Sequence, residues 1–594
     1  MTPFTAATRS SILLLMALAA CGGGGDGSSS QPTQAPGGVA GAPPAASTGS
    51  TQAEASPRPS VPPATVPPPA AKPPESDTPA APPTRGEPPS PTGPAPSAGS
   101  RTDGVWSSLV DWPLLSIHAV LLPDGRVLTY GTNISLHGGN RFMYDVFDPR
   151  RELDSAEAHL TLENTTGTFL FCSAQVVLPR TGEVMLTGGD VVVNGKVQNR
   201  GNGDINVFNA ADNTLRRDTT MQRPRWYATT TVLPTGEIYV QGGTDGEDHP
   251  ELRTEDGSFR LLEGIDTLKA APGGGTYFDN NYPRNFVAPN GKIFGFDHHW
   301  MYQVDPHASG DGGQPGSVTL FGAHWDIPNT RGGDSYRGWG ASSTAVMYRP
   351  GKILQVGGTQ ANATIIDITG ATPRLKDLPP LSQVRQWSNA TVMPDGRVFV
   401  SGGSSRNLLN DPASQDVGQV AFAPEIFDPV SESWSLAAPL SRPRFYHSLT
   451  LLLPDATILS TGGGSPGPLT NLNAQIYYPG YLFRNDGSRA TRPVIDQADG
   501  ALPLVVAPSS TFQLTSEDAA RIRRVTMVAT GSVTHSFDMN QRFVEPAFSV
   551  SGNRIDVALP ANAYETPPGY YMVFVIDDAG TPSRARMIRV NPLD

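Results

Sequence analysis

The sequence predicts an all-β protein, in which a seven-bladed β-propeller is followed by an immunoglobulin-like β-sandwich. A hairpin pattern with a proline-containing turn recurs seven times within residues 104–484, and short alternating strands fill residues 485–594. The composition agrees, because 63 Gly and 58 Pro with only 16% charged residues are typical of a turn-rich β protein. A chain of 594 residues is also long enough for more than one folded domain.

Each repeat consists of an apolar strand, a Pro-x-Gly type of turn and a second strand that alternates apolar and polar residues. In most repeats a glycine pair closes the hairpin. Proline restricts φ at the start of such a turn and glycine permits a positive φ at its end. A hairpin repeated about every 50 residues is typical of kelch-type propeller blades, so seven turns predict seven blades. The turn prolines stand at positions 123, 179, 234, 289, 350, 394 and 454.

The propeller pattern stops after the segment 477–483. Residues 485–594 contain short alternating strands, such as those around 511–514, 525–528 and 571–576, separated by Gly, Pro and Asn. A segment of this length with such short strands is typical of a small β-sandwich, which we expect as the C-terminal domain.

The first 21 residues have the pattern of a bacterial lipoprotein signal peptide. Arg9 provides a basic start, residues 12–19 an apolar core, and Leu-Ala-Ala-Cys21 an end that resembles a lipobox. The sequence therefore predicts export and lipidation of Cys21, with Gly23 favouring the outer membrane or cell surface over the inner membrane. The apolar core falls far short of the roughly 20 residues of a spanning helix. The alternative is an ordinary secretory signal that happens to end at a Cys.

Residues 22–103 consist mainly of Gly, Ser, Pro, Ala and Thr and contain almost no large apolar side chains. Such a segment cannot bury enough apolar surface to offset its loss of conformational entropy. We expect a disordered tether that holds the folded part away from the membrane.

The net charge of −12 and the absence of a Lys/Arg-rich run exclude nucleic acid as an expected partner. The chain has only two cysteines, Cys21 and Cys172. If Cys21 is acylated, Cys172 has no partner for an intramolecular disulfide. Cys172 is then either a buried core thiol or a residue that forms some other covalent bond.

The blade register brings several reactive side chains together. Cys172, Tyr227 and His447 each stand seven residues before the turn proline of their own blade, and Tyr446 precedes His447. Equivalent positions of a propeller lie at the same height around one axis, so we expect these side chains to meet near the mouth of the central channel. Taken singly, a Cys, a Tyr or a His in such a fold is usually structural; their coincidence points to a site.

His535, in the C-terminal region, adds a second imidazole to this set. Two imidazoles and two phenols form an N₂O₂ donor set, which suits Cu(II) in a square or tetragonal geometry. A thiol next to a phenol can be joined to it by oxidation, and a ring that carries sulfur loses an electron more easily.

Five short segments resemble the galactose oxidase and glyoxal oxidase family of copper-radical oxidases, and the resemblance extends over roughly residues 105–594. They occur in the order that the family has. The segments are FC at 171–172, RWY at 225–227, RPRFYHS at 442–448, AQIYYPGYLF at 474–483 and THSF at 534–537.

The resemblance implies roles for five residues and one copper ion per chain. Tyr227, joined to Cys172 by a thioether, would be the tyrosyl radical cofactor and an equatorial copper ligand. His447 and His535 would be the imidazole ligands of the copper, and Tyr446 the axial ligand and proton acceptor. His535 would reach the propeller from a loop of the sandwich.

The reaction implied by the resemblance is the two-electron oxidation of an aldehyde hydrate or a primary alcohol, with O₂ reduced to hydrogen peroxide. Substrate and O₂ would be the partners of an expected monomer that meets the membrane only through its lipid. Galactose oxidase stacks a Trp on the cross-linked Tyr, two residues after a glycine pair, where this chain has Asp245. This difference favours a glyoxal oxidase-like activity and leaves Trp300, Trp339 or Trp387 as candidates for an aromatic cover.

Two alternatives remain open at the level of the sequence. A non-catalytic kelch module on the cell surface, binding glycan or protein, would bind no stoichiometric copper and would lose no hydrogens between Cys172 and Tyr227. A copper protein that makes the cross-link could also serve to modify cell-surface glycan with its peroxide.

Overall fold

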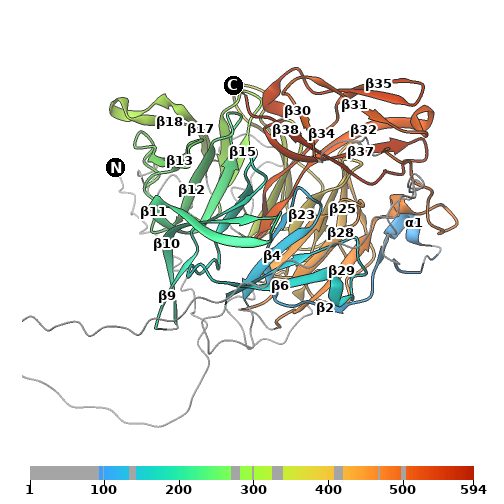
Figure 1. Ribbon diagram of the computed structural model, residues 1–594, viewed down its shortest axis with the longest axis horizontal. Helices are drawn as coiled ribbons and strands as arrows, with labels where there is room; N and C mark the ends of the chain where they lie inside the picture. The colour runs from blue at the N-terminus through green and yellow to red at the C-terminus, as the bar shows by residue number, and fades with distance from the viewer. Residues whose placement is uncertain are drawn as a thin grey trace, which may run out of the picture. The chain divides into compact units, whose positions relative to one another are not determined.

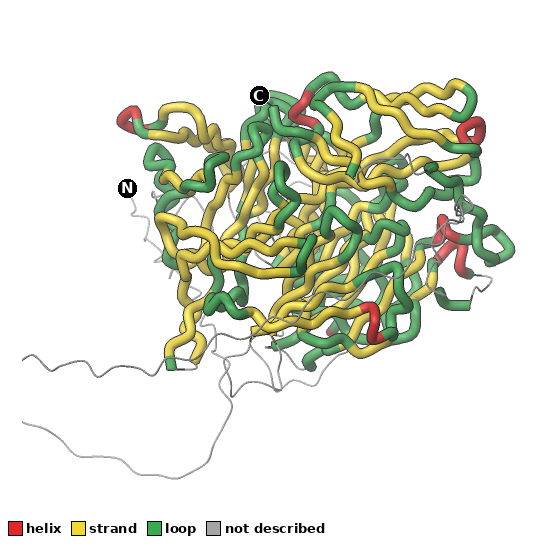
Figure 2. The backbone as a smooth tube through the Cα atoms, in the orientation of Figure 1, coloured by secondary structure: helices red, strands yellow, loops and turns green. Residues whose placement is uncertain are grey.

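The signal peptide, Cys21 and most of the tether lie outside the residues that the structure describes. Within the described part, strands dominate (Figure 2) and α1 (Ser100–Asp103) is the only α-helix. Among these residues, none of the helices has the length and apolar character to cross a bilayer. The computed structural model describes residues 93–95, 97, 99–132, 142–194, 196–268, 281–297, 300–323, 339–340, 342–406, 419–465, 469–496 and 503–593.

Six four-stranded antiparallel blades follow one another along the chain, each beginning with its inner strand (Figure 1). β11 is long enough to be the outer strand of blade 2 and then the inner strand of blade 3, and β9 (Asp190–Val193) extends the second blade by pairing with the start of β10. The strands of blades 1 to 3 are β3 (Leu115–Leu121), β4 (Val127–Thr132), β5 (Phe142–Phe147) and β6 (His159–Asn164); β7 (Ala174–Val177), β8 (Val184–Thr187) and β10 (Lys196–Asn209); β11 (Thr214–Val232), β12 (Ile238–Thr244), β13 (Glu251–Arg253) and β14 (Phe259–Leu261). Those of blades 4 to 6 are β15 (Arg284–Val287), β16 (Ile293–Phe296), β17 (Trp300–Ser309) and β18 (Pro315–Ala323); β19 (Ser343–Arg349), β20 (Lys352–Gly357), β21 (Ala363–Asp367) and β22 (Arg374–Asp377); β23 (Asn389–Val392), β24 (Val398–Ser401), β25 (Glu425–Asp428) and β26 (Ser433–Leu436).

The seventh blade joins the two ends of the propeller. Its inner strands are β27 (Ser448–Leu452), β28 (Ile458–Gly462) and β29 (Asn473–Tyr478), and its outer strands β1 (Val105–Trp106) and β2 (Val110–Asp111) come from the N-terminal side. Trp106 packs against Tyr477 with ring centroids 5.0 Å apart. Hydrogen bonds between these first strands and the last strand of the propeller close the ring.

The turn after each inner strand has the predicted geometry. Gly125, Gly236, Gly291 and Gly396 all have a φ between +81° and +87°. Blade 7 carries Ala456 at this place, and its φ of +66° shows that the turn imposes the left-handed conformation even on a residue with a Cβ. The inner strands β7, β23 and β27 are buried along their whole length, as expected for strands packed between neighbouring blades.

The C-terminal domain is a sandwich of two sheets, seen in red in Figure 1. Apolar side chains such as Val525, Met527 and Val573 fill the space between them. One sheet has the order β31–β36–β35, and the other contains β30, β38, β37, β32 and part of β34. The strands are β30 (Leu504–Val506), β31 (Thr511–Thr515), β32 (Ile522–Ala529), β33 (Ser532–Thr534), β34 (Phe537–Val544), β35 (Ala547–Ser551), β36 (Arg554–Ala558), β37 (Gly569–Asp577) and β38 (Arg586–Val590).

The hairpin β33–β34 extends from the sandwich into the propeller. β33 pairs antiparallel with β3 of blade 1, through His118 and Thr534, and β34 pairs parallel with β19 of blade 5, through Ala345 and Phe537. The tip of this hairpin therefore lies among the inner strands. The prediction of a seven-bladed propeller followed by a β-sandwich is confirmed.

Candidate metal centre

A single backbone position, repeated from blade to blade, supplies most of the site. It stands seven residues before the turn proline, one or two residues before the inner strand or, in blade 3, within the long strand β11. Five blades carry there a non-glycine residue with a left-handed backbone, which costs about 1–3 kcal/mol and is typical of functional sites. The five residues and their φ values are Cys172 (58°), Tyr227 (73°), Tyr282 (46°), Trp387 (65°) and His447 (66°).

Backbone hydrogen bonds link this position between adjacent blades. The Tyr227 N–H donates to the Cys172 carbonyl at 3.0 Å, and the Tyr282 N–H donates to the Tyr227 carbonyl at 2.8 Å. The Trp387 N–H likewise donates to the carbonyl of Ser342 in the preceding blade at 2.7 Å. The left-handed turns direct these side chains inward, and the hydrogen bonds fix their spacing.

His535 occupies the tip of the β33–β34 hairpin. Thr534 and Phe537 form the last pair of the ladder, so His535 and Ser536 are a two-residue loop. Both have positive φ, 45° and 65°, as a type I′ turn requires. His and Ser replace the Asn and Gly that usually fill such a turn, so the chain tolerates local strain to hold an imidazole at this tip.

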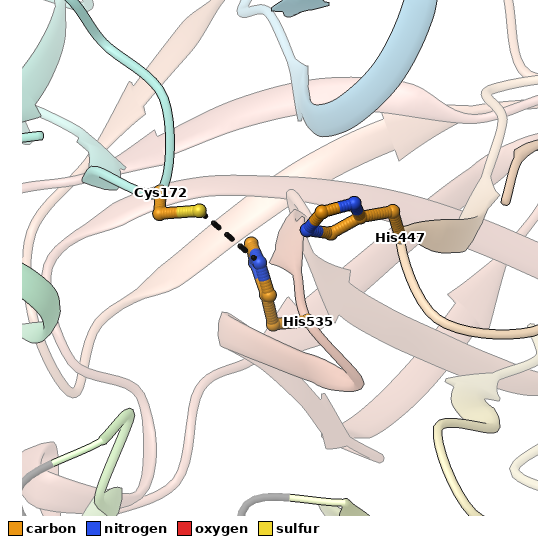
Figure 3. Close-up of side chains that lie close together, drawn as sticks. All are labelled: Cys172, His447 and His535. Atoms are coloured by element: carbon orange, nitrogen blue, oxygen red, sulfur yellow. Dashed lines mark hydrogen bonds between the residues drawn. The ribbon is translucent and has the colours of Figure 1, made fainter. Parts of the chain in front are cut away.

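The structure brings Cys172, His447 and His535 together from blade 2, blade 7 and the sandwich hairpin (Figure 3). Their potential ligand atoms all lie within 4.8 Å of one another, and all three side chains are buried. The Cys172 Sγ is 3.5 Å from the His535 Nε2. The two imidazole rings stand at 89° to each other with centroids 4.7 Å apart, so the edge of one faces the plane of the other.

Hydrogen bonds at Nδ1 set the tautomers of both histidines. His447 Nδ1 lies 2.8 Å from the Gly464 carbonyl, which can only accept, so Nδ1 carries the proton. His535 Nδ1 lies 2.6 Å from the Thr534 Oγ1, which itself donates to the Ile117 carbonyl at 3.0 Å. Both rings are thereby left with an Nε2 lone pair, and outer contacts of this kind are usual for metal-binding histidines.

Burial keeps both imidazoles neutral. Desolvation lowers the pKa of His447 to about 3 and that of His535 well below its usual range, with the neighbouring His447 contributing to the latter. The His447 Nε2 is buried and has no hydrogen-bond partner among the described residues. Leaving such an atom unsatisfied costs about 1–3 kcal/mol, a cost that a bound cation would offset.

Two phenols complete the cluster. The Tyr227 and Tyr446 hydroxyl oxygens are 2.5 Å apart, and both side chains are buried. Burial and the neighbouring Cys172 thiol raise the pKa of Tyr227 well above its usual range. The structure therefore brings together all five residues that the sequence assigned to the folded part of the site, and two neutral imidazoles with two phenols fit a Cu(II) ion. Cys21 lies outside the described residues.

The sequence did not predict the places that three aromatic residues take at the site. Trp226 and Tyr282 contact the Tyr227 ring at 4.2 and 4.9 Å, each edge-on. Trp387, one of the candidates for a cover over Tyr227, contacts Tyr446 instead at 4.6 Å, and Trp339 contacts Phe296. The blade register carried a signal for two of them, since Tyr282 and Trp387 stand at the same position before their turn prolines as Tyr227 does.

Asp245 has a structural role where the resemblance would place a Trp. Its two carboxylate oxygens share the single N–H of the Arg200 Nε, and one of them also accepts from the Gly201 N–H at 2.8 Å. These contacts fix the base of the β9–β10 hairpin. The side chain of Asp245 is thus committed to this hairpin and provides no ring for Tyr227.

Comparison with known proteins gives consistent similarities. The family model described as "Galactose oxidase-like, Early set domain" matches residues 492–590. Galactose oxidase of Gibberella zeae is 26% identical over 84% of the chain and 72% of its own length. Aldehyde oxidase GLOX of Vitis pseudoreticulata is 25% identical over 82% of the chain and 97% of its own length. A solved structure described as a novel fungal alcohol oxidase in complex with copper is 23% identical, with a TM-score of 0.68 over 82% of this chain and all of that one.

Proposed function

The chain belongs to the galactose oxidase and glyoxal oxidase family, and from this premise we propose that it is a copper-radical oxidase. Its substrate is an aldehyde, taken as the hydrate, or a primary alcohol, and O₂ is reduced to hydrogen peroxide. The observation that carries the proposal is the convergence of two neutral imidazoles, two phenols and a thiol from three blades and the sandwich hairpin.

Tyr227, Tyr446, His447 and His535 are the residues that would hold the copper. Bound copper would supply a Lewis acid for the substrate oxygen and a store for one electron. His447 and His535 present Nε2 atoms whose tautomers are already set, so binding the ion requires no proton transfer from either ring.

The two tyrosines divide the proton and the hydrogen atom between them. Tyr446, as phenolate, takes the proton of the substrate hydroxyl at its Oη. Tyr227, as its oxidised phenoxyl, takes a hydrogen atom from the substrate carbon. The hydrogen atom carries one of the two electrons that leave the substrate, and bound copper would store the other. O₂ takes up both electrons and both protons as hydrogen peroxide. The burial of both rings excludes bulk water from these transfers.

The Cys172–Tyr227 thioether forms by loss of two hydrogens, one from the Cys172 thiol and one from a ring carbon of Tyr227. The new bond joins Sγ to that carbon, and O₂ accepts the two electrons and two protons as hydrogen peroxide. The buried, mutually hydrogen-bonded backbones of the two residues support this pairing.

A glyoxal oxidase-like preference for aldehydes is the finer part of the proposal. Overall similarity does not separate the alternatives, because the galactose oxidase and the aldehyde oxidase are 26% and 25% identical to the chain. The engagement of Asp245 with Arg200 supports the aldehyde preference, because an acidic side chain paired to the β9–β10 hairpin stands at the position where galactose oxidase has its stacking Trp.

Cys172→Ser tests the proposal. Copper-loaded wild-type protein exposed to O₂ should lose two hydrogens by intact mass, show the optical absorption of a tyrosyl radical and release hydrogen peroxide from glyoxal, methylglyoxal or glycolaldehyde faster than from galactose. The variant should lose the mass change, the absorption and most of the activity. Survival of both the absorption and the activity in the variant would show that the cofactor is assigned wrongly. Wild-type protein that binds no stoichiometric copper would favour a non-catalytic surface module.

We also propose that the protein is exported and anchored by acylation of Cys21, on the basis of its lipobox-like sequence. Metabolic labelling with a radioactive fatty acid should mark the wild-type chain and not Cys21→Ala. Equal labelling of both would contradict the anchor without affecting the oxidase proposal.

A further inference from the structure

Tyr282 occupies in blade 4 the same position that Tyr227 occupies in blade 3. It lies two residues before β15, its φ is +46°, and only 2% of its surface is exposed. A large non-glycine residue in this conformation is costly unless the surroundings hold it there. The contacts of Tyr282 show which parts of the site its side chain connects.

Tyr282 connects the two strands that carry the thioether partners. Its N–H donates to the Tyr227 carbonyl at 2.8 Å, and its hydroxyl donates to the Ser173 carbonyl, the residue after Cys172, at 3.1 Å. The Tyr227 N–H in turn donates to the Cys172 carbonyl. These three hydrogen bonds form a closed loop that includes both Cys172 and Tyr227, so the separation of the two side chains depends on Tyr282.

The ring of Tyr282 also orients the imidazole at the hairpin tip. It stacks on His535 with centroids 4.7 Å apart and an interplanar angle of 27°, and it meets Tyr227 edge-on at 4.9 Å. The stack fixes the plane of the imidazole whose Nε2 faces the Cys172 thiol. One side chain thus contacts the radical tyrosine, the cysteine strand and a copper ligand.

Arg284 holds Tyr282 in place from the other side. Its guanidinium donates to the Tyr282 carbonyl and, at 2.6 Å, to the Ser343 carbonyl of blade 5. The same group lies 5.0 Å above the ring of Phe537, which follows the hairpin tip. Tyr282 is therefore tied to blades 2, 3 and 5 and to the hairpin, and its side chain has a fixed position.

We infer that Tyr282 is a positioning residue with two separable tasks. Its hydroxyl aligns Cys172 with Tyr227 for thioether formation, and its ring sets the orientation of His535 for copper binding. This inference rests on the proposed function, since it concerns how the same site is assembled. The cross-linking step is the one balanced above, with O₂ as the oxidant, and Tyr282 is not itself changed by it.

Tyr282→Phe removes the hydroxyl and keeps the ring. We expect cross-linking of copper-loaded protein in air, followed by the loss of two hydrogens in intact mass, to slow roughly 5–10-fold, the effect of about one hydrogen bond. The affinity for copper, measured without O₂ by competition with a chelator, should stay within about twofold of the wild-type value.

Tyr282→Leu removes the ring as well. Without the stack, the affinity for copper should fall roughly 10–100-fold, as is usual when an outer contact of a ligand histidine is lost. Cross-linking measured at saturating copper should be at least as slow as in the Phe variant. Tyr282→Phe therefore keeps the affinity for copper and slows cross-linking, whereas Tyr282→Leu loses both. A general loss of stability would not separate the two measurements in this way.

Tyr302→Phe is the matched control. Tyr302 is a fully buried tyrosine of the same blade, and its hydroxyl donates to the Asn285 Oδ1 at 2.9 Å and accepts from the Gln241 amide at 3.0 Å. This variant should lose similar stability and keep both the wild-type cross-linking rate and the wild-type copper affinity. Far-UV circular dichroism checks that each variant is folded before either measurement.

Either of two results in the Tyr282 variants would overturn the inference: cross-linking of Tyr282→Phe at the wild-type rate, or wild-type copper affinity in Tyr282→Leu. A slowing in Tyr302→Phe equal to that in Tyr282→Phe would also overturn it, since the effect would then reflect stability alone. Failure of the proposed function looks different, because wild-type protein itself would then neither bind copper nor lose two hydrogens.

Discussion

The buried ion pair between Arg225 and Glu251 supports the strand that carries Tyr227. Neither side chain has any exposed surface, and the Arg225 Nη2 lies 2.9 Å from the Glu251 carboxylate. The guanidinium also donates to the Gly242 carbonyl at 2.8 Å. Arg225 stands two residues before Tyr227, so this pair anchors blade 3 at the site.

Glu251→Gln should destabilise the protein strongly. The carboxylate accepts hydrogen bonds from the N–H groups of Gln222 and Arg223 as well as from Arg225. A Gln amide accepts through only one of its two end atoms and leaves the guanidinium without a counter-charge. Breaking a buried pair in this way costs about 3–5 kcal/mol. We expect the free energy of unfolding, from urea titration followed by tryptophan fluorescence, to fall by about that amount.

Blade 6 offers a matched control in the pair Arg385–Glu425. The Arg385 Nη2 lies 2.9 Å from the Glu425 carboxylate, the same distance as in blade 3. Arg385 also donates to the carbonyl of Gly402 in the glycine pair of its blade, and the Glu425 carboxylate accepts a hydrogen bond from the Ser382 N–H. Glu425→Gln should therefore cost a similar free energy. Because only blade 3 carries Tyr227, thioether formation should slow in Glu251→Gln and not in Glu425→Gln. Equal slowing in both variants, or a stability loss below about 1 kcal/mol in either, would refute the reasoning.

Three further outcomes are expected. Gly462→Ala should lower the free energy of unfolding by about 3 kcal/mol, because φ is +73° and a Cβ would lie 2.3 Å from the Ser116 carbonyl oxygen. Gly552→Ala should lower it by only about 1 kcal/mol, because φ is +64° but a Cβ would meet open space. Equal losses in urea unfolding would contradict this difference. Burial raises the pKa of Asp538 from 3.8 to about 6, so its stabilising proton is fully bound below pH 4 and lost as the pH rises through 6. The stability of wild type relative to Asp538→Asn should therefore fall by about 3 kcal/mol between pH 4 and 7, and a flat difference would refute this assignment. Trp106→Ala should lower the free energy of unfolding by about 3–5 kcal/mol, because Trp106 packs where blade 7 joins the two ends of the propeller and its indole N–H donates to the Ala438 carbonyl at 2.7 Å. An unchanged thermal midpoint would show that this junction contributes little stability.

Much of the fold followed from the sequence because turn chemistry is local. A Pro at the start and a positive φ at the end of a short turn need particular residues, so all seven turns left a visible mark. Ala456 is informative here, since the pattern identified the turn although its glycine is missing, and the structure shows the same left-handed backbone.

The placement of His535 could not be read in the same way. Its position depends on pairing of β33 with β3 and of β34 with β19, contacts between residues more than 150 positions apart in the chain. Only the resemblance of the THSF segment indicated it. Trp226 and Tyr282 were missed for a different reason, because an aromatic residue in a β protein is most often part of the core, and the role of these two appears only from what their rings contact.

The hairpin that delivers His535 also sets an order in time. A ribosome makes the propeller strands before the hairpin, because β33 begins at Ser532, after every strand of the seven blades. The ring of blades can close once β29 has met β1, yet the second imidazole is still absent at that stage. A nascent chain that has reached β29 but not β33 therefore carries Cys172, Tyr227, Tyr446 and His447 without the fifth residue of the candidate metal centre. The candidate metal centre is thus completed only after the blades that surround it have been made.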